Sequence, residues 1–428
     1  KNAIRKILVC LSRDNSLGRF QEAFAWKQLT YDFNGIQVTS DRFGDLFDES
    51  EAVVRRRRLA FNSTDGGDIS SNNFFIQYNN LPMGVERVGD RLFVTVPRRR
   101  YGIPSTLNYI DLTDAAPARS PPLRPYPDTR QSRQLTSVYR TRADGCGRLW
   151  MVDTGLLEIP GDPQQVQRPS IVIFDLNSNT VLRRYPLRDE DIPAANTPTG
   201  LASITVEIPQ DDCSNAYAYI PELTTYGIIV YSFRENRSWR VTHNYFHFDP
   251  TASTLRIGGQ RFQWNDGIFS IALSAPLRNG CRTAWFHPMV STHEFTVNTC
   301  ILRNSSASED SNYWGHYFVS DLGNRGEGSQ STMHDFHPSS HVLFFADIGR
   351  DAISCWNTDN PLTSQNIAIL AQNNLKLSYP SDLHVTGDEV WFMANNLPRW
   401  AYSRLDTDEY NFFIYRLVKY NMNMMPTW

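Results

Sequence analysis

The chain has 428 residues, of which 41% are apolar and 12% aromatic, a composition that supports a sizeable core and excludes a disordered protein. Its 42 Lys and Arg residues nearly balance 45 Asp and Glu residues, and the net charge of -3 gives no broad attraction to nucleic acid or to an anionic membrane. No apolar run approaches the ~18 residues of a membrane span. Small molecules and proteins are therefore the expected partners, with neither nucleic acid nor membrane among them.

Cysteine usage and sequons favour secretion. The sequence has six Cys residues and three N-x-[ST] sequons, at Asn62, Asn236 and Asn304, and it begins at Lys1 as if a signal peptide had been removed. The alternative is that the sequons arise by chance and the cysteines are buried thiols. We expect a secreted, extracellular, monomeric glycoprotein.

The first part of the chain precedes any repeat. A strand is expected within residues 24–33. Residues 49–73 contain four consecutive arginines, at 55–58, followed by a stretch of Ser, Asn, Gly and Asp. This composition is typical of a solvated loop insertion, with a basic contact patch or a protease-sensitive site as the alternatives.

Six similar units follow, and each runs through an apolar strand, turns at Gly, Asp or Asn, and returns through an aromatic-rich strand. The units open around Gly84, Val138, Gly200, Gly267, Asp335 and Asp382, at spacings of 54, 62, 67, 68 and 47 residues. A four-stranded blade needs about 40 residues, so each spacing accommodates one blade. We predict an all-β fold, a six-bladed β-propeller with a central channel that forms one domain over residues 1–428. A large β-sandwich is the alternative, and in the propeller residues 24–33 and 412–418 would pair in the last blade.

The unit pattern also predicts a polar funnel. Strand openings and the polar ends of the returning strands should meet at one end of the channel, and the residues concerned are Arg98, Asp153, Thr154, Thr199, Glu222, Asp266, His287, His334, Asp335, Ser381, Asp382 and Asn395. Carboxylates and imidazoles crowded together shift their pKa values toward neutrality and suit proton transfer. Alternatively, polar residues at strand ends cap blade turns by accepting backbone N–H groups.

Several motifs identify a family resemblance. The segments N-L-P-M-G-V-E at 80–86, L-W-M-V-D-T-G at 149–155, N-D-G-I-F-S at 265–270 and Y-P-S-D-L at 379–383 resemble the insect yellow and major royal jelly protein family. The resemblance runs from about residue 26 to 417. Q-R-P-S-I at 167–171 and G-L-A-S-I at 200–204 are most similar to the yellow branch that is associated with dopachrome conversion in melanin synthesis. The resemblance implies secreted six-bladed propellers with varied activities.

Dopachrome conversion to dihydroxyindole products is the activity that the resemblance favours, which would make the protein a tautomerase-like isomerase. That reaction needs a base and oxyanion donors, and we expect no cofactor and no metal. His287 is the first candidate base because its ordinary pKa lies near neutral, and His334 is the second. Glu222 and Asp266 complete the catalytic candidates. Arg98 would hold the substrate carboxylate, with Asp153, Thr154 and Asp382 lining the substrate site.

Noncatalytic binding of biogenic amines or catechols is the alternative function, and storage or signalling is a third. Salivary relatives imply an amine pocket at positions that correspond to Ser381, Asn395 and Leu397, with Phe269 and Trp400 as aromatic neighbours. The sequence has no motif for zinc hydrolysis, nucleotide binding or acyl transfer. Calcium bound by Asp153, Glu222, Asp266 and Asp382 is a weaker alternative, because nothing specifies the ligand number.

Cysteine positions predict two disulfides. Cys146 and Cys213 lie in equivalent turns of neighbouring blades and should pair. Cys281 and Cys300 flank a hairpin in which residues whose numbers sum to 581 face each other, so they should also pair. Cys10 and Cys355 stay unassigned.

Overall fold

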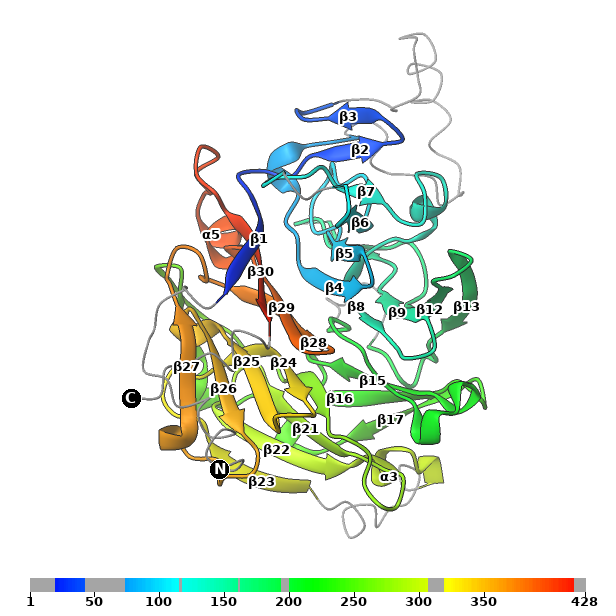
Figure 1. Ribbon diagram of the computed structural model, residues 1–428, viewed down its shortest axis with the longest axis vertical. Helices are drawn as coiled ribbons and strands as arrows, with labels where there is room; N and C mark the ends of the chain where they lie inside the picture. Colours follow the sequence, from blue (N-terminus) through cyan, green and yellow to red (C-terminus); the bar gives the residue numbers. More distant parts are fainter. Residues whose placement is uncertain are drawn as a thin grey trace.

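Six four-stranded antiparallel sheets form a closed ring in the computed structural model, which describes residues 20–42, 74–114, 118–160, 162–193, 200–306 and 319–418 (Figure 1). The strands of each blade are given from the axis outward. Blade 1 has β4 (Gly84–Val88), β5 (Arg91–Thr95), β6 (Leu107–Asp111) and β7 (Arg124–Pro125), blade 2 has β8 (Val138–Ala143), β9 (Arg148–Asp153), β12 (Ser170–Asp175) and β13 (Thr180–Pro186), and blade 3 has β14 (Thr205–Glu207), β15 (Tyr217–Glu222), β16 (Gly227–Ser232) and β17 (Arg237–Thr242). Blade 4 has β20 (Ile268–Leu273), β21 (Thr283–Pro288), β22 (His293–Asn298) and β23 (Val319–Asn324), blade 5 has β24 (Ser331–His337), β25 (Val342–Asp347), β26 (Ala352–Asn357) and β27 (Ile367–Gln372), and blade 6 has β28 (Pro380–Thr386), β29 (Glu389–Ala394), β30 (Phe412–Val418) and β1 (Gln21–Trp26). The predicted all-β six-bladed propeller is confirmed.

Middle strands carry most of the core. Every residue of β9, β16, β25 and β26 is buried, because each blade packs its two faces against its neighbours. This explains why these strands are largely apolar instead of alternating. The rim strand β13 is largely exposed, since it has a neighbour on one edge only.

The ring closes through the two ends of the chain. β1 pairs with β30 from Gln21 opposite Arg416 to Trp26 opposite Phe412, and the two strands lie side by side in Figure 1. The predicted pairing is confirmed for the first part of 24–33. Residues 31–33 instead form β2 (Tyr31–Phe33), which pairs with β3 (Ile36–Val38) in a separate hairpin.

Two blades begin at different residues from those that the repeat predicts. In blade 3 the axial strand β14 starts at Thr205, beyond the expected opening at 199–201, and has only three residues. In blade 5 the strand β24 starts at Ser331, so His334 and Asp335 lie within the strand and not at its opening. This shift moves both side chains away from the predicted funnel.

The axial strands of blades 2, 4, 5 and 6 share an irregularity near their first residues. Their pairing register shifts between Val138 and Thr141, Ile268 and Ser270, Ser331 and His334, and Pro380 and Asp382. Such bulges re-aim side chains locally. The residues inside them include Arg140, Phe269 and Ser381, which meet near the axis.

The remaining elements lie outside the six four-stranded sheets. They are the hairpins β10 (Leu156–Leu157) with β11 (Gln164–Gln165) and β18 (Thr254–Ile257) with β19 (Gln260–Gln263), the helices α3 (Thr299–Leu302) and α5 (Leu397–Tyr402), and the 3-10 turns η2 (Gln77–Asn79), η3 (Gln131–Gln134), η4 (Pro209–Asp211), η5 (Cys213–Asn215), η6 (Asn244–Phe246), η7 (Pro250–Ala252), η9 (Ile348–Arg350) and η10 (Ser364–Asn366). No helix in the described ranges is long and apolar enough to cross a membrane.

Both predicted disulfides are present. Cys146 bonds Cys213 and ties the β8–β9 turn to the turn before β15. Cys281 bonds Cys300 beside the β21–β22 pair, where Thr283 faces Asn298 as the sum of 581 requires. Cys355 is also disulfide-bonded. Cys10, the predicted insertion at 49–73, Asn62 and Thr199 lie outside the described residues.

Candidate functional site

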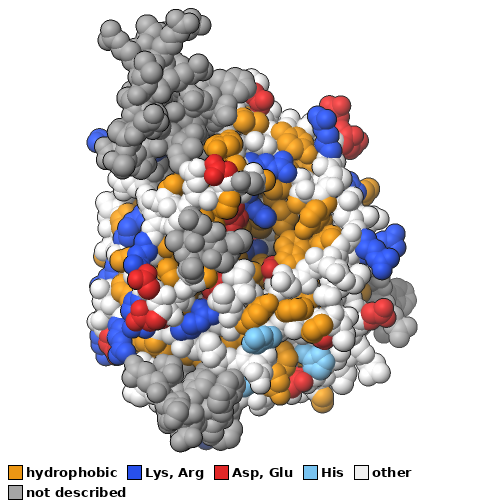
Figure 2. Space-filling model, turned by 180° about the vertical axis from the view of Figure 1, so that it is seen from behind, with side chains coloured by type: hydrophobic (Ala, Val, Ile, Leu, Met, Phe, Trp, Pro, Cys, Tyr) orange, Lys and Arg blue, Asp and Glu red, His pale blue; other side chains and the backbone are white. Residues whose placement is uncertain are grey.

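The channel has two mouths, which we name by the course of the axial strands. At the first mouth the axial strands begin and the second strands of the blades end. At the second mouth the axial strand of each blade connects to its second strand. One face of the molecule, shown in Figure 2, is hollowed near its centre, where hydrophobic side chains border a recess that also holds acidic and basic groups.

A cluster of ionisable side chains gathers at the first mouth. Its members are Arg99, Tyr139, Glu158, Asp266 and Tyr379, and they come from five different places along the chain. The Tyr139 hydroxyl donates a hydrogen bond to Glu158, and the Arg99 guanidinium lies 3.4 Å from the same carboxylate. Tyr139 and Tyr379 are almost fully buried, whereas the Arg99 side chain keeps 30% of its surface exposed. The cluster thus combines buried donors with a cation that solvent or a ligand can reach.

Asp266 has the chemistry of a base at this mouth. Removal from water raises the pKa of its carboxyl to about 7, and this outweighs the opposing effects of Trp264 and Arg99. A carboxyl with this pKa is partly ionised at neutral pH and can accept a proton there. The pKa of Tyr139 is raised well above its usual value by burial and by Glu158, so its hydroxyl stays a neutral donor.

Arg140 and Phe269 form the adjacent wall of the channel. The Arg140 guanidinium is buried, lies 4.9 Å from the centre of the Phe269 ring, and donates to the carbonyl oxygens of Ala202 and Ser381. Its Nε lies 3.6 Å from Asp382 Oδ1. The side chain therefore holds blades 2, 3 and 6 together while it presents positive charge near the axis.

Several polar residues predicted for the funnel act as caps in this structure. Asp153 accepts the backbone N–H groups of Thr136, Ser137 and Gly155. Glu222 is fully buried and accepts the N–H groups of Gly200, Thr224 and Thr225. These contacts match the capping alternative raised by the sequence, because the carboxylates are saturated by backbone donors.

The other residues predicted to contact substrate also form hydrogen bonds with the backbone. The hydroxyl of Thr154 donates to the Ser137 carbonyl oxygen, and that of Ser381 donates to the Met83 carbonyl oxygen. Asn395 donates to the Pro82 carbonyl and accepts the N–H of Leu397, and both residues are buried. Asp382 accepts the N–H groups of Val85 and Leu383. Their assignment to a ligand stays a prediction.

Arg98 and Arg99 have different surroundings. The Arg98 guanidinium donates to the carbonyl oxygens of Leu135, Thr136, Ile103 and Pro104, and so clamps two loops. Arg99, one residue later, reaches the first-mouth cluster. Three consecutive arginines at 98–100 were visible in the sequence, but their directions depend on the loop after β5.

Arg100 and Trp400 also lie together. The Arg100 guanidinium stacks 3.6 Å from the centre of the Trp400 ring, and the indole N–H donates to the Tyr78 carbonyl oxygen. One face of this aromatic ring is thus already covered by a cation.

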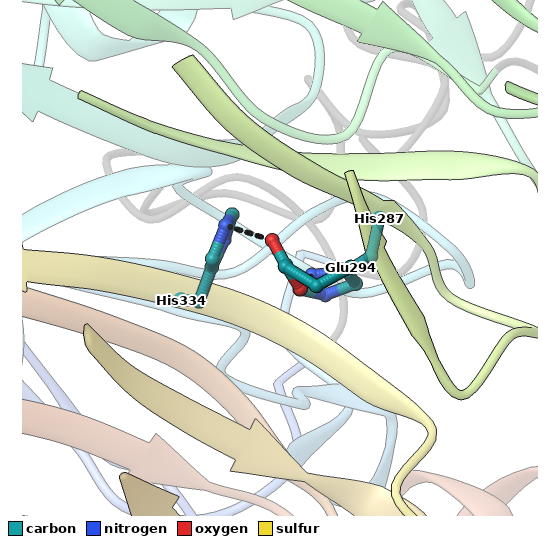
Figure 3. A group of neighbouring side chains, drawn as sticks. All are labelled: His287, Glu294 and His334. Atoms are coloured by element: carbon teal, nitrogen blue, oxygen red, sulfur yellow. Dashed lines mark hydrogen bonds and ion pairs between the residues drawn. The ribbon is translucent and has the colours of Figure 1, made fainter. Parts of the chain in front are cut away.

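The two candidate histidines meet in a buried cluster between blades 4 and 5. His287 Nδ1 lies 3.0 Å from Glu294 Oε2, and His334 Nε2 lies 3.1 Å from Glu294 Oε1 (Figure 3). All three side chains are fully buried, and burial lowers the pKa of His287 to about 4. Neither imidazole is open to solvent in this arrangement, and the assignment of the two histidines as bases stays a prediction.

At the second mouth a cavity of 610 Å³ is lined by residues from blades 2 to 6, among them Arg142, Arg282, Asp335, His337 and Asp388. Arg142 bonds Asp335 at 2.7 Å and approaches His384 Nδ1 at 2.6 Å. Asp335 therefore belongs to this mouth, not to the predicted funnel. Sequence reasoning missed this cavity, as well as Arg99, Tyr139, Glu158 and Tyr379, because no local motif marks them.

Comparison with known proteins gives consistent matches along the chain. The family model described as major royal jelly protein matches residues 136–425. "L-dopachrome tautomerase yellow-f" of Drosophila melanogaster is 41% identical over 402 residues, covering 92% of this chain and 91% of that protein. "Protein yellow" of Drosophila yakuba and that of Drosophila melanogaster are each 36% identical over 406 residues, covering 93% of this chain and 68% of those proteins.

Proposed function

The chain belongs to the major royal jelly protein family, and from that premise we propose that it converts L-dopachrome to a dihydroxyindole by tautomerisation at the first mouth of the propeller channel. The observation that carries the proposal is its 41% identity to the dopachrome tautomerase yellow-f over nearly the whole of both chains. The fold alone would not select this reaction, since propellers host many activities.

Asp266 is the proposed base. It removes a ring-carbon proton from dopachrome, and the electron pair of the broken C–H bond moves through the ring to the quinone. The quinone oxygen that gains this charge takes a proton from the neutral Tyr139 hydroxyl, whose O–H turns from Glu158 to the substrate as the charge develops. Loss of a second carbon-bound proton, or of the carboxylate as carbon dioxide, then sends another electron pair to the second quinone oxygen, which takes a proton from solvent. Asp266 releases its proton to solvent and Tyr139 regains one from it, so the dihydroxyindole forms and both residues are restored. No oxidant is consumed, because the ring carbons lose the electrons that the quinone gains.

Arg99 is the proposed anchor for the substrate carboxylate. Its planar guanidinium can hold a carboxylate through two parallel hydrogen bonds, and its exposed fraction of 30% leaves it accessible. Phe269 and Arg140 would border the ring of the bound substrate. The role proposed for Arg98 from the sequence passes to Arg99, because the Arg98 guanidinium is occupied by backbone carbonyls.

The test is turnover of fresh L-dopachrome, followed by loss of its colour and by chromatographic identification of the dihydroxyindole product. We expect Asp266→Asn to lower kcat by ~10²-fold or more, because the amide cannot accept the proton. In the wild-type protein kcat/KM should rise with pH through about 7, where Asp266 ionises. Asp321→Asn, a half-exposed carboxylate beside His293, is the matched control and should retain activity.

Full turnover by Asp266→Asn would remove this residue from the mechanism. Absence of any turnover, together with stoichiometric uptake of serotonin or dopamine in calorimetry, would instead support the amine-binding alternative.

Secretion and glycosylation also belong to the proposal. The two disulfides are typical of an oxidising compartment, and Asn236 and Asn304 are exposed as acceptors require. Intact mass of the secreted protein before and after removal of N-glycans would test both sequons. Elution at the size of one chain would test the predicted monomer.

A further inference from the structure

Two histidines and a glutamate converge on one point between blades 4 and 5. His287 comes from β21, Glu294 from β22 and His334 from β24, and Figure 3 shows the carboxylate between the two imidazoles. Their possible ligand atoms all lie within 4.8 Å of one another, and the three side chains are buried. We propose that this cluster binds a divalent metal ion of the zinc type, which joins the two blades.

The hydrogen bonds of His287 motivate the proposal. Its Nε2 lies 3.2 Å from the Thr332 carbonyl oxygen, which can only accept a hydrogen bond. Its Nδ1 lies 3.0 Å from Glu294 Oε2, another acceptor. An imidazole with one proton can satisfy only one of these neighbours, so its lone pair faces an oxygen. When Nε2 carries the proton, that oxygen belongs to the Glu294 carboxylate, and a cation between the two would relieve this contact.

His334 presents the second half of the same arrangement. Its Nδ1 lies 2.7 Å from the Ser270 hydroxyl, while its Nε2 points at Glu294 Oε1 from 3.1 Å. Neither Nε2 nor Oε1 makes a hydrogen bond of acceptable geometry within the described residues. Metal-binding histidines commonly use the second ring nitrogen for a hydrogen bond to a carbonyl or hydroxyl, as both histidines do here.

The donor set selects the class of metal. Two imidazole nitrogens and one carboxylate oxygen provide three donors of the kinds that Zn²⁺ binds, at about 2 Å from each. Calcium and magnesium prefer oxygen ligands alone. The donors must move closer together to hold the ion, because two donors that each lie ~2 Å from one ion are at most ~4 Å apart, whereas these atoms are spread over as much as 4.8 Å.

Arg325 tunes the cluster. Its guanidinium lies 2.5 Å from Glu294 Oε2 and also donates to the carbonyl oxygens of Ser291, His293 and Ser329. It fixes the carboxylate and offsets part of its negative charge, so the two imidazole nitrogens are needed as further donors to the metal. Because the cluster is enclosed, the bound ion would stabilise the blade interface and take no part in catalysis. This inference is independent of the proposed function.

Metal content of the wild-type protein is the direct test. The full chain is purified without a polyhistidine tag, incubated with Zn²⁺, dialysed and analysed by elemental mass spectrometry. We expect about one zinc ion per chain, and a melting temperature that a strong chelator lowers and added Zn²⁺ restores. No retained metal, with a melting temperature insensitive to both treatments, would overturn the proposal and indicate a doubly protonated His287 instead.

Variants locate the ion. His334→Asn and Glu294→Gln should each lose the zinc and the chelator response, whereas His293→Asn, which changes a neighbouring half-exposed histidine, should keep both. Zinc retained by His334→Asn and Glu294→Gln would place the metal elsewhere and overturn this assignment. If a cluster variant does not fold, Zn²⁺ in the wild-type chain is replaced by Co²⁺ and the absorption spectrum is recorded. The proposed site predicts the spectrum of tetrahedral Co²⁺ with nitrogen and oxygen ligands, and a spectrum of another kind would contradict it.

Discussion

Single residues at strand ends divide into two groups in this propeller. Asp153, Glu222 and Asp382 receive several backbone N–H groups each, and this ties down the loops that connect the strands. No backbone N–H donor to the Asp266 carboxylate is found among the described residues. Removal of this carboxyl from water raises its pKa to about 7. Residue type alone is therefore a poor guide to chemistry at this mouth, because the number of backbone donors around each carboxylate determines how many of its acceptor sites remain open.

Adjacent arginines provide a prediction at this scale. Arg99→Gln should lower kcat/KM for dopachrome by ~10 to 100-fold, since a charge-assisted hydrogen bond contributes about 1.5–3 kcal/mol. Arg98→Gln should lower the melting temperature instead, because its guanidinium holds four carbonyl oxygens. Steady-state kinetics and thermal unfolding of both variants check this, and an interchange of the two effects would contradict the site geometry.

At the scale of elements, irregular pairing of the axial strands matters more than their length. The bulges in β8, β20 and β28 bring Arg140, Phe269 and Ser381 together at the axis. A strand of regular pleat would direct alternate residues into neighbouring blades and would not bring the Arg140 guanidinium, the Phe269 ring and the Ser381 carbonyl oxygen together. Disulfides act at the same scale, because they tie elements at the ends of the blades.

The two disulfides should differ in their contribution to stability. Cys146–Cys213 closes 67 residues and Cys281–Cys300 closes 19. Chain entropy gives losses of about 4 and about 3 kcal/mol on replacing each pair by Ala. Denaturant unfolding of the two double variants measures this difference. A greater loss from Cys281→Ala/Cys300→Ala would show that the loop between blades 2 and 3 is ordered by other contacts.

For the whole molecule, closure of the ring depends on contacts between segments distant in sequence. β1 completes the last blade, and additional links join the blades to the hairpins outside them. Asp351, at the end of η9, accepts the N–H of Gly258 in the β18–β19 turn, and burial raises its pKa to about 7. A carboxyl with a raised pKa therefore lies between η9 and the β18–β19 turn.

Stability should consequently depend on pH through Asp351. The pKa is about 7 in the folded protein and about 3.9 when unfolded. The stabilising contribution of the neutral acid is thus fully present below about pH 4 and is lost as the pH rises through 7. Asp351→Asn, whose φ of 49° an Asn tolerates, should raise the melting temperature at pH 8 and leave it unchanged at pH 4. Equal effects at both pH values would assign the change to packing.

The sequence by itself determined the number of blades, the pairing of the chain ends in the last blade and two disulfides. Strand and turn patterns depend on residues that are close in sequence. Because each blade is formed almost entirely by one continuous segment, these patterns recur at the long spacing of one blade and can be recognised in the sequence. The residue numbers of two positions that face each other in a hairpin add up to a constant, which is why Cys281 and Cys300 could be paired from their residue numbers alone.

Only the tertiary structure decided which residues share a mouth. A bulge or a loop shifts side chains by one or more positions without leaving a signal in composition. For this reason Arg99, and not Arg98, lies beside Glu158, and His334 lies in the blade interface. Burial, which raises the pKa of Asp266, arises from segments far apart in the chain. The physical reason is that strand propensity acts between neighbours in sequence, whereas desolvation and hydrogen-bond saturation depend on everything that packs around a group.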